Sequence, residues 1–445
     1  MTAYADKRAR LAASLAADAG GGFGLAKETS NLFRDRAPRA RPRVDLSGFD
    51  RVIAVDAAAG TVDAEGMTTF VDLADATLAH GTMPAVVPQL KSITLGGAVA
   101  GVGIEASSFR HGLVHETVTA MDVLTGDGRI VTCTADNDHR DLFFGLPNSY
   151  GTLGYTLRLT ARTVPVKRYV ALKHRAFREP ESFFAALAES IQDPDVDFLD
   201  GVVFSPDALV LSPARFVDEA PFASDYTYER IYYKSLRERA SDYLTTRDYL
   251  WRWDTDWFWC SKNLGAQNPV LRRVYGRGRL NSIFYQKVMR WNTRWKLGAA
   301  IERVRGLRAE SVIQDVDLPL AHAAAFLRFL FAEVGVLPIW ICPIRGPEAA
   351  GRYPLYPLEP GTAYVNFGFW DRVTMREARP AGYINRKIEE RVREMGGLKS
   401  LYSDSYFSEE EFWSIYNRPA YAALKAKYDP GGALPDLYAK CVLKR

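Results

Sequence analysis

The feature that most constrains this chain is a run of glycine and other small residues at positions 88–108. The run contains Gly96, Gly97, Gly101 and Gly103. Glycines let backbone N–H groups converge on an anion without obstruction by a Cβ atom, and serine and threonine side chains in the run add hydroxyl donors. The run therefore predicts a nest for a phosphate-bearing cofactor, although the same small residues also suit tight packing of a loop in a core.

Two common phosphate-binding loops do not fit this run. It lacks the Gly-Lys-Ser/Thr ending of a Walker loop, and its Gly-Gly pair does not belong to a strand–GxGxxG–helix unit. A second glycine-bounded turn, Ser149–Gly154, leads directly into the expected strand Tyr155–Leu159. Two such loops with strands between them indicate a shared ligand.

Composition limits the classes of protein that this chain can belong to. At 445 residues with 47% apolar side chains, it is long enough for two packed lobes. A formal net charge of +4 is too small to indicate nucleic-acid binding across the whole surface. The four cysteines lie far apart, which argues against a zinc site or a disulfide framework and fits a reducing cytoplasm. Neither a signal peptide nor a run of about 18 apolar residues is visible, so we expect a cytoplasmic protein that meets the inner face of the membrane peripherally.

The pattern of elements predicts an α+β fold with three parts. Residues 1–166 form a strand-rich lobe, residues 167–407 a second lobe, and residues 408–445 a helical segment that we expect to return to the first lobe. The second lobe alternates strands and helices, which suits an antiparallel sheet covered by helices, and carries an aromatic and basic insertion at about residues 225–305. The expected elements are strands at Arg51–Asp56, Thr61–Ala64, Ala120–Leu124, Arg129–Thr134, Tyr155–Thr163, Tyr169–Arg175, Phe198–Phe204, Ala208–Ala214, Ser311–Asp317, Leu337–Ile344, Thr362–Trp370 and Leu398–Tyr406, and helices at Thr68–His80, Pro180–Gln192, Pro319–Val334 and Ala378–Met395.

From about Pro88 onward the chain resembles the FAD enzymes of the vanillyl-alcohol-oxidase fold, the PCMH-type FAD-binding family. Thr94–Ser108 looks like the flavin-binding run of that family, and Ser149–Gly154 looks like its second FAD loop. The resemblance implies FAD held without a covalent bond, because His111 and His115 stand outside the usual tethering motif. The cofactor-binding residues that we assign are Gln89, Ser92, Ile93, Thr94, Leu95, Gly96, Gly97, Gly101, Gly103, Ile104, Ser107, Ser108, Ser149, Gly151, Thr152 and Gly154.

Within this family the chain resembles the sterol C24–C25 double-bond reductases. Val312–Asp315, Pro338–Pro343 and Leu401–Tyr406 are similar to cap-lobe segments of those enzymes. At Thr29–Arg34 and Pro88–Ser108 the chain is more similar still to a soluble bacterial offshoot, which reduces the methylene branch of a 10-methylene fatty acyl chain in a phospholipid. The resemblance therefore implies a phospholipid acyl substrate, with a sterol side chain as the alternative, NADPH as electron donor and a lipid methyltransferase as a candidate partner.

Reduction of an isolated alkene takes a hydride and a proton on adjacent carbons, so the protein must supply an acid. Tyr402, Asp404 and Tyr406 alternate along the expected strand Leu398–Tyr406 and would share one face of it. We take these three as candidate catalytic residues, with Glu105 of the glycine run as a fourth. The alternative is structural: core aromatics, a carboxylate at a sheet edge, and a carboxylate that binds only ribityl or backbone groups.

The insertion carries the most unusual charge pattern in the chain. Residues 271–297 hold eight basic and no acidic residues, interleaved with aromatic side chains, and the tryptophan-rich stretch 251–259 lies just upstream. This pattern suits a segment lying among lipid headgroups, and the alternative is a helix that packs its aromatics on the cap lobe. Gln314, with Asp315 beside it, lines the expected pocket or is an ordinary strand residue. The candidate substrate and membrane residues are Gln314, Arg290, Trp291, Arg294 and Trp295.

Other functions share parts of this pattern. An FAD oxidase or dehydrogenase acting on an alcohol or a sugar would share the flavin loops, and oxygen consumption with candidate alcohols would reveal it. A non-enzymatic lipid-binding partner of the methyltransferase would keep the fold but lack the yellow flavin spectrum. Nucleic-acid binding by the basic insertion has the least support, because no recognisable binding module accompanies it.

Overall fold

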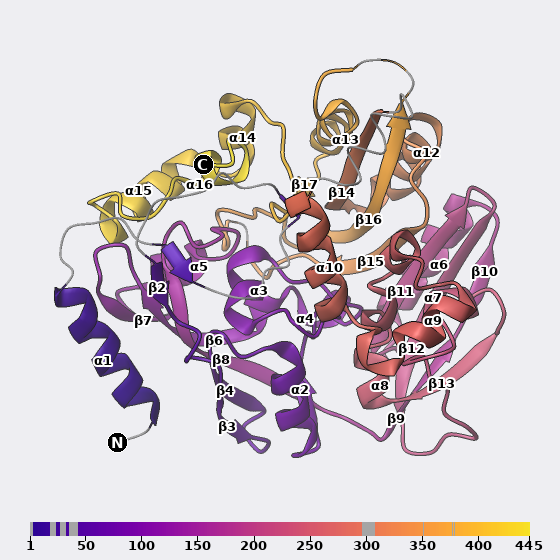
Figure 1. Ribbon diagram of the computed structural model, residues 1–445, viewed down its shortest axis with the longest axis horizontal. Helices are drawn as coiled ribbons and strands as arrows, with labels where there is room; N and C mark the ends of the chain where they lie inside the picture. The colour runs from indigo at the N-terminus through magenta and orange to yellow at the C-terminus, as the bar shows by residue number, and fades with distance from the viewer. Residues whose placement is uncertain are drawn as a thin grey trace.

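The computed structural model describes residues 3–17, 24–26, 33–34, 43–295, 308–349, 351–375, 377 and 379–445. Within these ranges the chain forms two lobes, each built on its own antiparallel sheet, and the C-terminal helices lie against the first lobe (Figure 1). This arrangement confirms the expected α+β fold class.

The N-terminal lobe is built on a six-stranded antiparallel sheet of order β3-β4-β8-β6-β7, with β5 pairing with the far end of β8. Its strands are β3 (Val52–Asp56), β4 (Thr61–Glu65), β5 (Thr82–Pro84), β6 (Val118–Leu124), β7 (Ile130–Thr134) and β8 (Tyr155–Pro165). Its helices are α1 (Ala3–Ala17), α2 (Phe70–Leu78), α3 (Leu95–Gly101), α4 (Ser108–His111) and α5 (Arg140–Gly145), with a 3-10 turn η1 (Val114–Thr117). A separate parallel pair joins β1 (Gly24–Ala26) to β2 (Arg43–Asp45).

Helix α2 illustrates how the sequence sets these elements. It begins after Thr69, whose hydroxyl accepts a hydrogen bond from the backbone N–H of Asp72. Phe70, Leu73 and Thr77 are buried at the spacing of one helical face, so the helix packs on the sheet through that face.

The cap lobe is built on a nine-stranded sheet in which every pairing is antiparallel, of order β13-β9-β12-β11-β15-β16-β14-β17, with β10 pairing with β12. Its strands are β9 (Tyr169–Lys173), β10 (Arg175–Phe177), β11 (Phe198–Ser205), β12 (Ala208–Val217), β13 (Ser241–Thr245), β14 (Arg308–Pro319), β15 (Ile339–Arg345), β16 (Ala363–Met375) and β17 (Leu398–Lys399). Its helices are α6 (Pro180–Gln192), α12 (Ala323–Glu333), which follows the 3-10 turn η5 (Leu320–His322), and α13 (Tyr383–Glu394).

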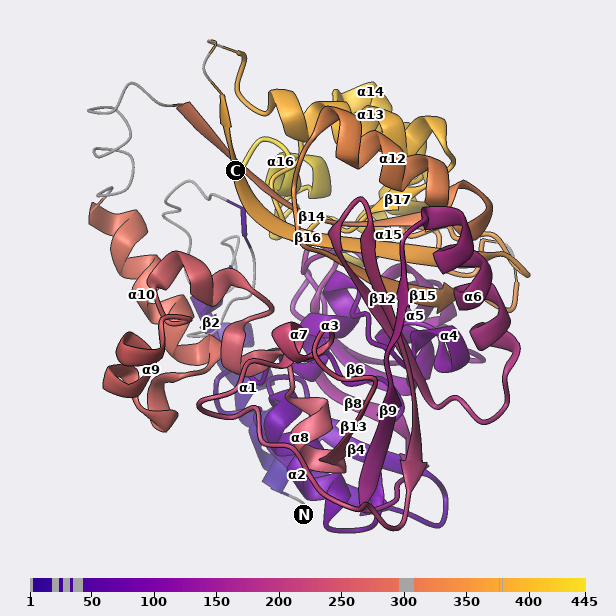
Figure 2. The same ribbon diagram turned by 90° about the vertical axis from the view of Figure 1, so that its right-hand side faces the viewer.

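These three helices cover one face of the cap sheet. Figure 2 shows α12 and α13 lying on the side of β14 and β16 that points away from the N-terminal lobe. Phe183 of α6, Phe326 of α12 and Ile388 of α13 share one hydrophobic core with the inward-facing residues of the sheet. The other face of β14 and β16 is thereby left to meet the N-terminal lobe.

The insertion between β12 and β14 extends the cap lobe. It adds β13 to the sheet edge and contains α7 (Tyr232–Ser235), α8 (Thr246–Leu250), α9 (Pro269–Tyr275) and α10 (Ser282–Trp295), with the 3-10 turns η2 (Asp254–Asp256), η3 (Cys260–Leu264) and η4 (Arg277–Arg279). The expectation that its upstream tryptophans lie among lipid headgroups is wrong: Trp251, Trp253, Trp257 and Trp259 are all buried. Their rings pack on one another and on neighbouring aromatics, as in the perpendicular contact of Trp253 and Trp259, so they form core.

The expected strand Leu398–Tyr406 is also wrong beyond its first two residues. Strand β17 pairs with β14 only through Leu398 and Lys399, and the chain then turns toward the N-terminal lobe. There the backbone N–H of Phe33 donates to the carbonyl of Tyr402. Lys399 also forms a buried ion pair with Glu389, which holds the start of the turn against α13. Tyr402, Asp404 and Tyr406 therefore do not share a strand face.

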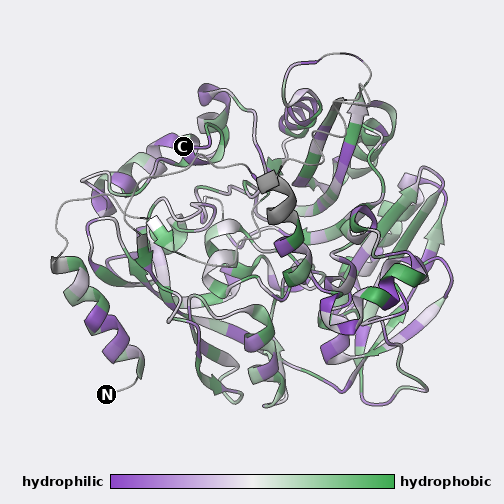
Figure 3. Cartoon of the chain, in the orientation of Figure 1, coloured by the Kyte–Doolittle hydropathy of each residue, from purple (hydrophilic) through white to green (hydrophobic). Residues whose placement is uncertain are grey.

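The C-terminal segment contains α14 (Glu409–Ile415), α15 (Arg418–Tyr428) and α16 (Leu437–Cys441) and contacts the N-terminal lobe. The hydroxyl of Tyr428 donates to Asp141 of α5 at 2.7 Å, and Lys425 donates to the carbonyl of Thr152 at 2.8 Å. Figure 3 shows hydrophilic and hydrophobic turns alternating along α15, as expected for a helix with one buried side. In the described part of the chain, no helix combines the length and the apolar character needed to span a bilayer.

Candidate functional site

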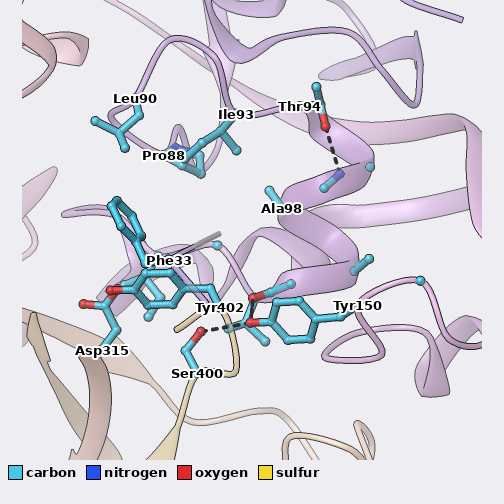
Figure 4. A pocket seen from close by; sticks show the side chains of 18 of the residues that line it. Phe33, Pro88, Leu90, Ile93, Thr94, Ala98, Tyr150, Asp315, Ser400 and Tyr402 are labelled. Atoms are coloured by element: carbon cyan, nitrogen blue, oxygen red, sulfur yellow. Dashed lines mark hydrogen bonds between the residues drawn. The ribbon is translucent and has the colours of Figure 1, made fainter. Parts of the chain in front are cut away.

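A cavity of about 640 Å³ lies between the two lobes. Its wall combines the glycine run of the N-terminal lobe, residues of β14, β15 and β16 of the cap lobe, the tryptophan-rich part of the insertion and the C-terminal segment. This volume falls within the range of small-molecule and cofactor sites. Figure 4 shows Thr94, which caps α3, and Ala98 of α3 on one side of this cavity, with Asp315 and Tyr402 across from them.

The wall on the side of the N-terminal lobe is built from glycine backbone. Gly66, Gly96, Gly97, Gly101 and Gly103 all line the cavity. Space is tight behind this wall, because a Cβ atom at Gly96 would lie 2.1 Å from the hydroxyl of Thr156 and 2.8 Å from the carbonyl of Gly66. Packing against Gly66 and Thr156 therefore requires a glycine at position 96, and the N–H of Gly96 donates to the carbonyl of Gly66.

The second glycine turn adds to the same wall. Gly151 and Gly154 line the cavity, and Gly151 has a φ of 73°, a left-handed conformation that glycine adopts without a steric penalty. The neighbouring Tyr150 also lines the cavity, and its hydroxyl donates to the carbonyl of Gly101 at 2.7 Å. The two loops that the sequence singled out thus meet at one cavity.

Cationic side chains accompany this glycine wall. Arg34, Lys440 and Lys444 line the cavity. Arg34 is buried with its guanidinium 4.9 Å from the centre of the Tyr150 ring, and one of its nitrogens donates to the carbonyl of Leu401 at 2.7 Å. Its Nε and Nη2 have no hydrogen-bond partner among the described residues. Buried donors without partners beside a glycine cradle fit an anionic group such as a pyrophosphate.

The wall on the cap side is aromatic. Trp257, Phe258, Trp340 and Trp370 line the cavity, and the ring centres of Phe258 and Trp370 lie 4.4 Å apart. Phe33 joins them, with its ring centre 5.4 Å from that of Trp257. A wall of this kind offers flat apolar surfaces to a planar ring system or to a hydrophobic substrate.

One carboxyl on this wall lies beside a tyrosine. Asp315 of β14 and Tyr402 both line the cavity and interact with each other, and the Tyr402 hydroxyl accepts a hydrogen bond from the indole N–H of Trp370 at 2.8 Å. Gly368 pairs opposite Asp315 in the sheet, and a Cβ atom there would lie 2.6 Å from Asp315 Oδ1. The glycine therefore makes the space that the carboxyl occupies.

Asp315 is set up to carry a proton at neutral pH. Burial, reinforced by the nearby Asp317 carboxylate, raises the pKa of Asp315 to about 8, against the lowering effect of the Tyr402 hydroxyl. Its Oδ1 has no hydrogen-bond partner among the described residues. Burial also raises the pKa of Tyr402 well above its ordinary value, so the pair holds its protons at neutral pH.

A second buried carboxyl, Glu105, reaches the cavity from the N-terminal lobe. It forms an ion pair with Arg252 at 3.4 Å, and Arg252 in turn pairs with Asp200 at 2.8 Å. Gln89 donates to the other oxygen of Glu105. Burial raises the pKa of Glu105 to about 8 even though the Arg252 guanidinium opposes the shift.

The structure divides the predicted cofactor residues into two groups. The residues on the cavity wall are Gln89, Ile93, Thr94, Gly96, Gly97, Gly101, Gly103, Ile104, Gly151 and Gly154. The residues away from the wall are Ser92, Leu95, Ser107, Ser108, Ser149 and Thr152. Several hydroxyls of the second group bind the protein itself: Ser107 donates to the carbonyl of Ala85, and Thr152 to that of Ser149. These side chains shape the loops from behind.

The predicted catalytic residues also separate. Tyr402 and Glu105 lie on the cavity wall, whereas Asp404 and Tyr406 do not, because the strand that was expected to align them ends at Lys399. Asp404 forms an ion pair with Lys444 at 3.1 Å. Tyr406 does not line the cavity, because its ring packs beside Gly382 at the start of α13.

Gln314 does not line the cavity, contrary to expectation. Alternation along β14 turns its side chain toward α13, where it donates to Asn385 at 2.7 Å, and turns Asp315 toward the cavity.

His111 and His115 are likewise absent from the lining of this cavity, and burial lowers the pKa of His115 to about 3. The backbone of α10 carries Arg290, Trp291, Arg294 and Trp295, whose side chains lie outside the described part of the structure.

Sequence reasoning missed several groups on this wall. Lys440, Trp370 and Gly368 come from segments far apart in the chain, and none belongs to a motif that marks it. Arg34 ends the segment Thr29–Arg34 that carries the resemblance, but no role was assigned to it. Asp315 was named beside Gln314 as a candidate for the pocket, without a catalytic role, and it lies on the cavity wall. The signal for such a role is a carboxylate in a strand predicted to be buried.

Comparisons with known proteins agree with this geometry. Residues 26–134 match the family described as the FAD binding domain. The Delta(24)-sterol reductase of Homo sapiens is 28% identical over 405 residues, which cover 87% of this chain and 75% of the human protein. The enzyme of the same name from Pisum sativum is 24% identical over 446 residues, covering 89% of this chain and 76% of the relative.

A third relative is similar over a shorter stretch. Cytokinin dehydrogenase 7 of Oryza sativa subsp. japonica is 32% identical over 150 residues, which cover 33% of this chain and 28% of the relative. Similarity to the sterol reductases therefore extends across both lobes, whereas similarity to the cytokinin dehydrogenase covers one third of the chain. The chain carries an FAD binding domain and is an FAD-dependent oxidoreductase, distantly related to the Delta(24)-sterol reductases.

Proposed function

We propose that this protein reduces an isolated carbon–carbon double bond in a lipid with non-covalently bound FAD. The observation that carries the proposal is one cavity that joins a glycine wall with cations to an aromatic wall bearing the Asp315 and Tyr402 pair. The first wall suits the phosphates of FAD, and the second suits an apolar substrate that must receive a proton.

The glycine wall and its cations would hold the cofactor. The N–H groups of Gly96 and Gly97 already donate to the carbonyl of Gly66 and the hydroxyl of Thr94, so the phosphates would lie along the glycine surface of α3, and Arg34 and Lys440 would supply the positive charge beside them. Reduced FAD supplies a hydride when bound. The tight fit behind Gly96 fixes this wall in place, so the cofactor would be positioned by backbone that cannot move aside.

The cap wall would supply the proton and exclude water. Asp315 holds a proton below pH of about 8, and Tyr402 lies beside it on the same wall. Positive charge that develops on the branched carbon of an alkene is stabilised by aromatic faces such as those of Trp370 and Phe258. A proton delivered from Asp315 to one alkene carbon, with a hydride to the other, completes the reduction.

A branched alkene of a sterol side chain is the substrate that we place first. The relatives named above are sterol reductases by name, and their similarity covers most of this chain. The 10-methylene acyl chain of a phospholipid has the same chemistry, a branched alkene without a carbonyl, and is the competing substrate. NADPH remains the proposed electron donor.

The test is a single-turnover reduction under anaerobic conditions. The protein is purified with its yellow flavin, reduced with NADPH or NADH, and mixed with a side-chain-unsaturated sterol or with a methylene-branched phospholipid. We expect reoxidation of the flavin spectrum and a product that has gained two hydrogens by mass, with deuterium on the protonated carbon when the reaction runs in D2O. The control is Tyr402→Phe, which should bind flavin normally and reduce the lipid more slowly.

Two results would contradict the proposal. A purified protein that carries no flavin and cannot be loaded with FAD would exclude a flavoenzyme. Rapid oxygen consumption with alcohols or sugars, with neither lipid reduced, would instead identify an oxidase or a dehydrogenase.

A further inference from the structure

Strongly exposed large hydrophobic side chains gather on one part of the insertion. In the described ranges eight such side chains are strongly exposed, and four of them, Val270, Leu271, Val274 and Ile283, lie on α9 and at the start of α10. Val270 is 68% exposed and Val274 is 71% exposed. We call these four residues the aliphatic patch. Contiguous exposed apolar residues on a folded protein commonly mark a surface that meets something else.

Helix α9 is anchored so that this patch must face outward. Arg272 is buried on the opposite side of the helix and pairs with Asp256 at 2.6 Å. Val270 and Val274 are four residues apart, so they lie on one helical face, and Leu271 lies next to them. The ring of Tyr275 meets that of Phe284 at 5.9 Å, which brings the end of α9 to the start of α10 beside Ile283.

Basic side chains surround the patch. Arg273 and Arg277 are exposed and pair with Glu229 and Asp225. Arg279 and Lys287 are also exposed, and within the described ranges neither has a carboxylate at ion-pair distance. The surface is therefore apolar in the centre and has at its rim two cations that meet no carboxylate within the described ranges.

This surface adjoins the cavity. Trp257 lines the cavity, and its ring is stacked on that of Tyr285 in α10 with 6.4 Å between the ring centres. Figure 2 shows α9 and α10 side by side at an outer edge of the molecule, away from the cap helices. The first turn of α10 therefore packs against the aromatic wall of the cavity.

We propose that the aliphatic patch and its basic rim dock the protein on an anionic lipid surface. The inference rests on the proposed function in one respect, since a lipid substrate gives the protein a reason to meet a bilayer. Charge favours a lipid over a second copy of the chain, because two copies facing each other would bring Arg279 and Lys287 together. Short aliphatic side chains with cations at their edge match the boundary between headgroups and acyl chains.

The experiment is flotation of the purified flavoprotein with vesicles. Vesicles of phosphatidylcholine alone are compared with vesicles that also contain phosphatidylglycerol. We expect binding to the anionic vesicles, a loss of about tenfold or more for Val274→Glu, and wild-type binding for Ile53→Glu, which places the same charge at an exposed hydrophobic position of β3. Arg279→Ala combined with Lys287→Ala should weaken binding and reduce its sensitivity to salt.

Activity on detergent-dispersed substrate separates this inference from the proposed function. Val274→Glu should reduce dispersed lipid at the wild-type rate and vesicle-borne lipid slowly. Wild-type protein that fails to float with anionic vesicles overturns the docking surface, whether or not it reduces dispersed lipid. Concentration-dependent association of the wild type that Val274→Glu abolishes, without vesicle binding, also overturns it and assigns the patch to a second copy.

Discussion

Two buried carboxyls reach the same cavity and differ in what holds them. Burial raises the pKa of both Glu105 and Asp315 to about 8. Glu105 contacts the buried guanidinium of Arg252, which also pairs with Asp200. Asp315 interacts with the hydroxyl of Tyr402, and the nearby Asp317 carboxylate makes its ionised form less favourable still.

This difference separates a structural role from a chemical one. A carboxyl beside a buried cation is tied to that cation, because moving either group leaves the other uncompensated. A carboxyl with no cation beside it can give up a proton and take it back without disturbing a charge network. We therefore interpret Glu105 as the member of a charge cluster that joins the two lobes, and Asp315 as the acid.

Removing Arg252 should produce the largest effect. In Arg252→Met, Glu105 and Asp200 would remain buried without their cation, and the expected loss in the free energy of unfolding is about 3–5 kcal/mol. Thermal and denaturant unfolding followed by far-UV circular dichroism measure this loss. Asp315→Asn, which removes no partner of a buried charge, is the matched comparison and should change stability far less. Equal losses in the two variants would contradict the division of roles.

The loss of activity should be larger for a change at Asp315 than for a change in the charge cluster of Glu105. Asp315→Asn removes the proposed acid, and we expect the rate of alkene reduction to fall about 100-fold or more, the usual range for a lost general acid. Glu105→Gln keeps the size of the side chain and should cost less than about tenfold. Single-turnover rates with flavin reduced beforehand measure both. A larger loss for Glu105→Gln would make Glu105 the acid.

The same two clusters show what the sequence could predict. The glycine wall was predictable because its residues are neighbours in the chain and their chemistry depends on backbone alone, as at Gly96 and Gly97. The cap wall was not, because Asp315, Trp370 and Tyr402 meet only after β14, β16 and the turn beyond β17 have paired. We chose Tyr402 as a candidate because of a strand that does not form. It lies on the cavity wall for another reason than the expected alternation.

The antiparallel cap sheet was predictable from strand and helix order, and the alternation along β14 also carried a signal for the side that each residue faces. Gln314 alternates with Val312, Val316 and Leu318, whose side chains lie in the core under the cap helices, whereas Asp315 lies on the other face of the sheet. The prediction placed Gln314 on the pocket side because it did not use this alternation.

The pH dependence of the reduction rate should show which of the two carboxyls is the acid. The protonated form of Asp315 is the active one, so the rate is at its full value below pH of about 8 and falls roughly tenfold per pH unit above it. Asp315→Asn should lack this fall, and Glu105→Gln should keep it. A wild-type rate that stays constant between pH 7 and about 10 would exclude Asp315 as the acid.

Stability should depend on pH in the same direction for both carboxyls. Because folding raises each pKa, each contributes stability that is fully present below its ordinary pKa near 4 and is lost as the pH rises through about 8. The free energy of unfolding of the wild type, measured across this window, should decrease toward alkaline pH. The dependence should be smaller in Asp315→Asn, even though that variant reduces the alkene slowly.

Asp404 provides the smallest expected effect and the sharpest contrast with Asp315. Both carboxylates belong to segments that the sequence marked, but Asp404 lies outside the cavity, and its ion pair with Lys444 joins side chains that are 23% and 31% exposed. Solvent screens such a pair, so Asp404→Asn should change the free energy of unfolding by less than about 1 kcal/mol and the rate of reduction by less than about twofold. Unfolding curves and single-turnover rates measured beside Asp315→Asn test this. A loss of rate close to that of Asp315→Asn, with flavin content unchanged, would return the acid to Asp404 and would mean that the turn after β17 moves when substrate binds.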